Sequence, residues 1–143
     1  MIKIKTICIS GYFSILHLGH IRYIRDAKKL GDKLIVIINN DEQLFNKKGN
    51  IIMNEEQRKE ILESIKWVDE VVISIDTDSS VCKTLEMIKP DIFANGGDRF
   101  EDNIPEVKTC KDNNIEMIFN VGEGGKIDSS TRLLETYMPP LEE

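Results

Sequence analysis

Hydrophobic and polar positions follow two periods along the chain, and these predict strands and helices in regular succession. The stretch IKIKTICIS, residues 2–10, has the alternation of a strand. A loop is expected from Gly11, and apolar residues then recur at helical spacing over residues 19–30, with Gly31 ending the helix. The run KLIVIINN, residues 33–40, is almost continuously apolar, which is typical of a strand buried on both faces of a parallel sheet.

The second half of the chain continues this succession. Residues 41–53 are expected to form a loop. Asn54 with Gln57 three residues later is a typical helix start. The apolar stripe of this helix is expected to comprise Ile61, Leu62, Ile65 and Trp67. The remaining expected elements are strands at 70–75, 91–96 and 115–121 and helices at 80–89, after Pro105 and at 129–137.

Alternating strands and helices predict an α/β fold, a Rossmann-like, doubly wound, five-stranded parallel sheet. Residues 1–143 are expected to form a single domain, since this length supports one core. Ligands of such sheets bind where the carboxyl ends of the strands meet. Four segments should gather at that edge: 11–20, 39–41, 96–99 and 121–131.

Charge and cysteine usage narrow the functional classes. The formal net charge is −6 and the pI is about 5.0, so a general nucleic-acid-binding surface is not expected. The three cysteines are far apart and form no C-x-x-C pair, so they are expected to be reduced, buried and not catalytic. No secretory leader or membrane-spanning run is apparent, and a cytoplasmic protein without membrane contacts is expected.

Both histidines of the chain fall within HLGH, at the junction of the first strand and the first helix. Two imidazoles at a helix start can face an anion that lies over free backbone N–H groups. A metal site would need a third ligand, and none is evident, so no metal-ligating residues are predicted. The structural alternative is that His17 and His20 are ordinary polar residues flanking a helix start.

The stretch GYFSILHLGH resembles the G-x-F-D-x-x-H-x-G-H signature of the nucleotidyltransferases that include glycerol-3-phosphate cytidylyltransferase and heptose-1-phosphate adenylyltransferase. The resemblance continues in order through AKKLGDKLIVIINND, EQRKEILESIKWVDEVV, KPDIFANGGD and SST. It implies in-line attack of a substrate phosphate on the α-phosphorus of a nucleoside triphosphate, with release of pyrophosphate. It also implies Mg²⁺ as cofactor and a homodimer.

The resemblance implies roles for individual residues. Catalytic roles would fall to His17, His20, Lys47 and Lys48, the lysines on a mobile cationic loop that closes over the triphosphate. The alternative for the lysines is a solvated charge pair, and for Arg58 it is a helix-surface position. The implied nucleotide-binding residues are Gly11, Tyr12, Phe13, Gly19, Arg58, Asp98, Ser129, Ser130 and Thr131, and the implied acceptor-binding residues are Ser14, Asp41 and Arg99.

The chain departs from the family pattern at two places. Ser14 stands where relatives carry an aspartate, so a carboxylate near the reacting phosphates is missing. Arg132 follows Thr131 directly, whereas relatives place a cationic residue two or three positions later. One position turns a helical side chain by about 100°.

The favoured interpretation is transfer of a nucleoside monophosphate from CTP to a small phosphorylated alcohol or sugar such as glycerol 3-phosphate. The adenylyl alternative uses ATP and a sugar 1-phosphate, and NGGDR is nearer to its K-G-G-D pattern. A nucleotide-binding module without turnover is a second alternative, permitted by Ser14. A dinucleotide-binding oxidoreductase domain is disfavoured because no G-x-G-x-x-G follows the first strand.

Overall fold

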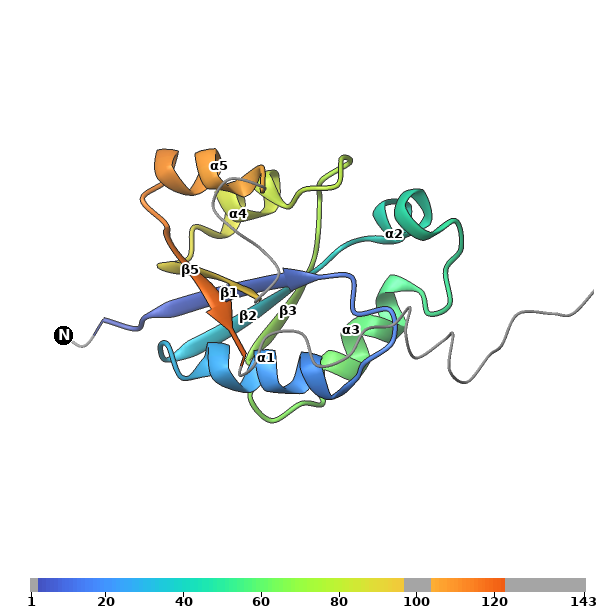
Figure 1. Cartoon of the computed structure of the whole chain (residues 1–143), viewed down its shortest axis with the longest axis horizontal. Coiled ribbons are helices and arrows are strands. Elements are labelled where there is room, and N and C mark those ends of the chain that lie inside the picture. The colour runs from blue at the N-terminus through green and yellow to red at the C-terminus, as the bar shows by residue number, and fades with distance from the viewer. Residues whose placement is uncertain (1–2, 97–103, 123–143) are drawn as a thin grey trace, which may run out of the picture.

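A computed structural model of the chain describes residues 3–96 and 104–122. The elements alternate between strand and helix, except where two helices follow one another (Figure 1). In chain order they are β1 (Thr6–Gly11), α1 (Leu18–Lys28), β2 (Lys33–Ile38), α2 (Asp41–Lys48), α3 (Glu55–Glu63), β3 (Glu70–Ile73), α4 (Cys82–Ile88), β4 (Ile92–Gly96), α5 (Glu106–Asp112) and β5 (Glu116–Val121).

The five strands form one parallel sheet in the order β3-β2-β1-β4-β5, which confirms the predicted fold class. Helices α1 and α3 lie on one side of the sheet and α4 and α5 on the other (Figure 1). The strand order changes direction between β1 and β4, because β1 leads outward to β2 and β3 whereas β4 and β5 lie on its other side. Sheets of this kind bind ligands in the crevice at such a switch point.

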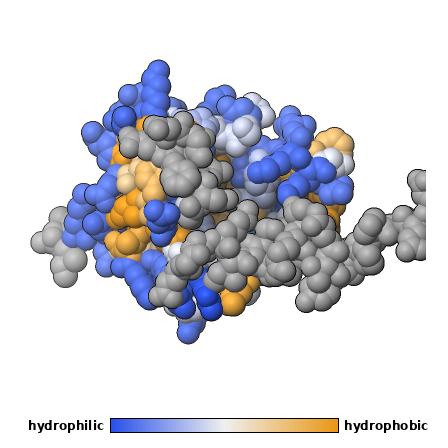
Figure 2. Space-filling model, viewed as in Figure 1, coloured by the Kyte–Doolittle hydropathy of each residue, from blue (hydrophilic) through white to orange (hydrophobic). Residues whose placement is uncertain are grey.

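The sheet separates two apolar clusters. Ile7 and Ile9 of β1 pack with Ile24 and Ala27 of α1 on one face. Cys8, between them in sequence, packs with the α4 and α5 residues on the other face, because successive strand residues point to opposite sides. All of Leu34 to Ile38 in β2 are buried, as predicted for a central strand. On the outer surface, apolar residues gather over the edge strand β5 and hydrophilic ones over α5 (Figure 2).

The predicted loop at residues 41–53 is wrong over its first part, which is α2. Asn40 caps this helix: its side chain accepts from Gln43 N, and the Gln43 side chain accepts from Asn40 N. Gly49 ends the helix at φ 80°, a left-handed conformation that favours glycine. The helix carries only two apolar residues, Leu44 and Phe45, so the sequence shows no helical repeat of apolar positions there.

The predicted α3 stripe needs a correction as well. Leu62 is buried, but Ile61 is exposed, and α3 ends at Glu63 before Ile65 and Trp67. These two residues pack against the core from the following turn. The helix predicted at 129–137 lies outside the described residues. Among the residues that the structure describes, no helix is long and apolar enough to cross a bilayer.

All three thiols were predicted to be buried, and this holds for two of them. Cys8 and Cys110 lie in the α4/α5 cluster, whereas Cys82 is partly exposed at the start of α4. Burial, reinforced by nearby Glu70, raises the pKa of the Cys8 thiol to about 12. Burial, reinforced by Glu106, raises the pKa of the Cys110 thiol to about 12 as well. Both are therefore neutral packing groups at physiological pH.

We expect the buried thiols to make the fold sensitive to alkaline pH. The folded-state pKa of Cys8 lies above its unfolded value, so its contribution is complete below about pH 8.5 and is lost as pH rises toward 12. The loss should be at most about 1.4 kcal/mol per pH unit for this thiol. Urea unfolding of the wild type and Cys8→Ala at pH 8 and pH 10, roughly bracketing the unfolded pKa, measures it. Equal losses in the two proteins would contradict the expectation.

Candidate functional site

The two histidines together cap the first turn of α1. His17 is the N-cap residue, and its Nδ1 accepts a hydrogen bond from Gly19 N at 3.1 Å. His20 Nδ1 accepts from His17 N at 3.3 Å, which completes a reciprocal capping box. Both histidines are therefore helix-start residues, and their predicted catalytic roles stay predictions. A capping role also fixes which imidazole nitrogen carries the proton.

Because Nδ1 accepts in both rings, the neutral imidazoles carry their proton on Nε2. Each histidine therefore presents an Nε2–H donor. The two rings are stacked, with centroids 3.9 Å apart and planes 25° from parallel. Capping and stacking together orient both donors before any ligand arrives, as electrostatic stabilisation of a developing negative charge requires.

Phe13 supports this pair from the β1–α1 loop. Its ring meets His20 edge-on, with centroids 5.0 Å apart. Its backbone has φ 48°, a left-handed conformation that is uncommon for an aromatic residue. The ring covers Gly11, where an added Cβ would lie 2.9 Å from Phe13 Cε2. Gly11 therefore makes room for Phe13, and the predicted nucleotide contacts of both residues stay predictions.

The predicted lysine loop is a helix end. Lys47 and Lys48 occupy the last turn of α2, and both are exposed. Lys47 Nζ lies 4.6 Å from the centroid of the Tyr12 ring, within the range of a cation–π interaction. Both lysines therefore lie on a regular helix, which contradicts the expected loop conformation. Lys47 lies beside residues 12–17 between β1 and α1, the histidine loop.

A cavity of about 530 Å³ opens beside Tyr12 and Lys47. Its walls come from α2, from the loop after β3 and from the start of α5. The lining residues are Tyr12, Gln43, Asn46, Lys47, Thr77, Asp78, Ser79, Ile104, Pro105 and Glu106. Only Tyr12 and Lys47 were predicted as site residues. Residues 77–79 follow β3, and the rule that ligands bind at carboxyl ends of strands is the signal that identifies them.

Amide side chains hold the cavity wall in place. Gln43 Nε2 donates to Asp78 O at 2.6 Å and to Ser80 O at 2.9 Å. Asn40 Nδ2 donates in the same way to Ser74 O and Asp76 O. These bonds join α2 to the loop after β3. Carbonyls of this loop are thereby satisfied without a regular backbone ladder.

Asp76 fixes the other end of the same loop. Its buried carboxylate accepts hydrogen bonds from Lys83 N at 2.8 Å and from the Thr84 hydroxyl at 2.6 Å. It also accepts from Thr84 N. The carboxylate thus binds otherwise unsatisfied N–H groups at the start of α4. The loop that lines the cavity is anchored on both sides.

Arg58 is buried, not at the helix surface, so the periodicity-based alternative is wrong. It is 1% exposed. Its guanidinium donates to the Tyr12, Asn39 and Met53 carbonyls and to the Asp41 carboxylate. The predicted phosphate contact of Arg58 and the predicted acceptor contact of Asp41 stay predictions.

The other predicted site residues fall into two groups, those that the structure describes and those outside the described residues. Ser14 is buried beside Phe13, and Gly19 donates its backbone N–H to His17. Five lie outside the described residues: Asp98, Arg99, Ser129, Ser130 and Thr131. Arg132, the second departure from the family pattern, also lies outside.

The described residues contain no cluster of metal-ligating side chains. Within 3–96 and 104–122, no three or more histidine, cysteine, aspartate or glutamate residues are grouped so that they could hold a metal ion. Mg²⁺ in nucleotide enzymes is bound through substrate phosphates and one or two carboxylates. The described residues therefore do not form a dedicated protein cage for Mg²⁺.

The model of the family described as cytidylyltransferase-like matches residues 8–136, which include the histidine loop, α2 and the cavity walls. The chain belongs to the cytidylyltransferase-like family. It is accordingly a nucleotidyltransferase, as the HLGH motif and its neighbours predicted.

Two curated relatives match nearly end to end. The FAD synthase of Picrophilus torridus is 36% identical over 137 residues, which cover 92% of this chain and 97% of that protein. The FAD synthase of Archaeoglobus fulgidus is 34% identical over 132 residues, covering 90% of this chain and 94% of that protein. The similarity therefore extends through both the histidine loop and the segments that line the cavity.

Solved structures agree on the fold. The lipopolysaccharide core biosynthesis protein of Thermoplasma volcanium superposes with a TM-score of 0.70 at 29% identity, covering 84% of this chain and 98% of that one. A pantoate-beta-alanine ligase of Francisella tularensis superposes with a TM-score of 0.59 at 20% identity, covering 83% of this chain and 60% of that one. The second likeness establishes the fold alone.

We expect His20→Ala to lower kcat by about 10²–10³-fold, the loss typical of one preorganised donor. The KM for nucleotide should change much less, because the interaction strengthens mainly in the transition state. Steady-state pyrophosphate release measures both. His20→Gln is the matched control, since glutamine at this position retains the capping box. It should restore the unfolding temperature but only part of kcat. Wild-type turnover in His20→Ala would contradict the expectation and leave the histidines with a helix-capping role alone.

Gly11→Ala should also slow turnover. The added Cβ would force the Phe13 ring away, and that ring supports His20. A misplacement of this kind costs about 10- to 100-fold in kcat. Gly31→Ala is the control, because its Cβ would clash with Ile7 in the core, remote from the histidines. The control should lower the unfolding temperature while kcat stays unchanged. The expectation fails if both variants lose only stability.

Proposed function

We propose that this nucleotidyltransferase is an adenylyltransferase of the FAD synthase type, which transfers AMP from ATP to the phosphate of FMN and releases pyrophosphate. The observation that carries the proposal is the 36% identity to an FAD synthase over 92% of this chain and 97% of that protein. This similarity favours the adenylyl alternative over the CTP and glycerol 3-phosphate interpretation preferred from the sequence.

The chemistry assigns a task to each described group. An oxygen of the FMN phosphate attacks the α-phosphorus of ATP in line, the bond from the α-phosphorus to the bridging oxygen breaks, and pyrophosphate leaves. The Nε2–H groups of His17 and His20 donate to oxygens on which negative charge increases. Lys47 and Lys48 attract the phosphates at the end of α2. Mg²⁺, bound to the triphosphate, would neutralise part of the charge that develops on it.

The cavity supports a large acceptor. Its volume of about 530 Å³ falls in the range of sites for drug-sized ligands, whereas glycerol 3-phosphate has only three carbons. Tyr12, Ile104 and Pro105 offer apolar surface suited to a flat ring. Thr77, Asp78 and Ser79 offer oxygens suited to a chain of hydroxyls. FMN carries both a flat ring and a polyol chain.

The remaining roles are part of this proposal. Asp98, Ser129, Ser130 and Thr131 would contact the nucleotide, the last three through hydroxyl groups and backbone N–H groups. Arg99, with Ser14 and Asp41, would contact the acceptor. A homodimer is likewise proposed. The second candidate function, a nucleotide-binding module without turnover, is favoured by Ser14, because the usual carboxylate is absent there.

Substrate pairs test the proposal directly. With Mg²⁺, ATP and FMN should give FAD and pyrophosphate, separated by chromatography. CTP with glycerol 3-phosphate should give no turnover. Riboflavin is the matched control, since it fills the same cavity but lacks the attacking phosphate. Turnover with CTP and glycerol 3-phosphate alone would overturn the assignment. Binding of ATP with no pyrophosphate release from any acceptor would favour the non-catalytic module.

A further inference from the structure

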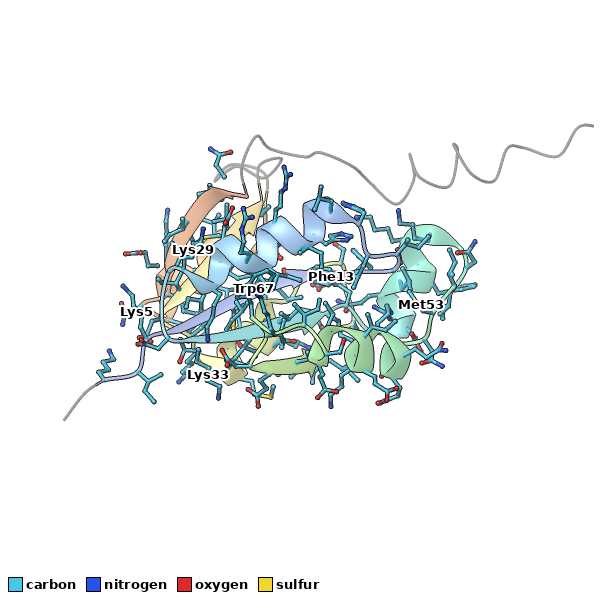
Figure 3. All side chains as sticks on the ribbon, turned by 90° about the horizontal axis from the view of Figure 1, so that it is seen from below. Lys5, Phe13, Lys29, Lys33, Met53 and Trp67 are labelled. Carbon is cyan, nitrogen blue, oxygen red and sulfur yellow. The ribbon has the colours of Figure 1, made fainter. Side chains whose placement is uncertain are left out.

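Arg58 joins two segments that are distant in sequence to the turn just before its own helix. Its Nη1 donates to Tyr12 O at 2.9 Å, in the histidine loop, and to Asn39 O at 2.6 Å, after β2. Its Nε donates to Met53 O at 3.1 Å, just before α3. Phe13 and Met53 lie toward one end of the molecule, whereas Lys5 and Lys33, beside the amino ends of β1 and β2, lie toward the other (Figure 3). The guanidinium therefore lies near the carboxyl edge of the sheet.

The pair with Asp41 extends this connection into α2. Arg58 Nη2 donates to Asp41 Oδ1 at 2.9 Å, and Asp41 is the first residue of α2. Asp41 N in turn donates to Glu55 Oε1, at the start of α3. The opposite end of α2 carries Lys47, whose ammonium lies over the Tyr12 ring. One arginine thus holds both Tyr12 and the helix that supports Lys47.

Stability alone is a weak reason for such a group. A buried ion pair loses hydration that its attraction only partly replaces, and apolar side chains of similar volume are often at least as stabilising. A guanidinium, however, offers five donors in a rigid planar fork. Its four bonds to protein oxygens end on three segments, which are the histidine loop, residues 39–41 and the turn before α3. The geometry is suited to fixing the loops relative to one another.

We propose that Arg58 is a positioning residue, which holds the histidine loop and α2 at the separation that nucleotidyl transfer requires, and that it does not bind substrate phosphate. The inference rests on the proposed transfer reaction but not on the identity of its acceptor. The histidine loop carries His17 and His20, and α2 carries Lys47, so in the proposed reaction both supports act on the reacting phosphates. In-line attack requires the reacting atoms to meet within about 3–3.5 Å, so relative movement of these two supports would slow the chemical step.

Arg58→Lys tests the proposal while retaining the charge. Lysine has no planar fork and cannot reach all four oxygens at once. We expect kcat to fall by about 10- to 100-fold, with the KM for nucleotide nearly unchanged. Asp41→Asn should change kcat in the same direction by a smaller factor. Because Asp41 is also a proposed acceptor contact, the hydrogen exchange of this variant, and not its kcat, carries the test if Arg58→Lys does not fold. Lys59→Ala, on the same helix and without a part in this network, should behave as wild type.

Coupling to Lys47 separates positioning from general stability. If Arg58 acts through α2, Lys47→Ala should lower kcat less in Arg58→Lys than in the wild type. The changes in unfolding temperature caused by Lys47→Ala and Arg58→Lys should add up in the double variant, because Lys47 is exposed. Independent effects on kcat would overturn the proposal. So would a raised KM for nucleotide with unchanged kcat and a reduced salt dependence, which would make Arg58 a phosphate ligand.

Hydrogen exchange gives a readout that does not depend on turnover. In Arg58→Lys and in Asp41→Asn, the amides of residues 12–16 and of residues 41–48 should both exchange faster than in the wild type. The amides of β1 should exchange at the wild-type rate. If FAD formation fails but this joint exchange is seen, the proposed acceptor is wrong and the connection stands. Unchanged exchange in both segments, or joint exchange with wild-type kcat for pyrophosphate release, would overturn the positioning role.

Discussion

Backbone carbonyls just beyond the ends of the parallel strands need partners from outside the sheet, and the candidate functional site depends on how they are satisfied. A buried carbonyl or amide without a partner costs about 1–3 kcal/mol. Tyr12 and Asn39 follow β1 and β2, and both their carbonyls accept from Arg58. Carbonyls after β3 accept instead from Asn40 and Gln43. Substrates of such a fold bind at the same edge, so these bonds also shape the site.

Helix ends supply the rest of the site. His17 and His20 satisfy N–H groups at the start of α1, and this requirement leaves the proton of each ring on Nε2. Lys47 and Lys48 occupy the last turn of α2, where the partial negative charge of the helix end favours cations. Capping and catalysis are therefore not competing explanations for these residues. The same hydrogen bonds that stabilise the helices fix the orientation of the donors.

The sequence predicted the sheet well because its strands are apolar and its helices are short and capped. Residues 33–38 could hardly be anything but a central strand, and the HLGH motif located the first helix start. The prediction from the sequence failed at α2, because this polar helix has too few apolar residues to show a helical period. The prediction also failed at Arg58, since its burial depends on oxygens from two distant segments and from the turn just before its own helix. The cavity was missed for the same reason, because no single stretch contains it.

Charge sets a final condition on the proposed reaction. The chain carries a formal net charge of −6, yet ATP and FMN are both anions, so their attraction must come from local groups. The lysines at the end of α2 are exposed and therefore act through a screened field. Ser14 adds no negative charge beside the histidine loop, where a carboxylate would repel an acceptor phosphate. Preoriented histidine donors with nearby lysines are thus consistent with the proposed reaction between two anions, in which the lysines would supply the attraction and the imidazoles the selectivity for the transition state.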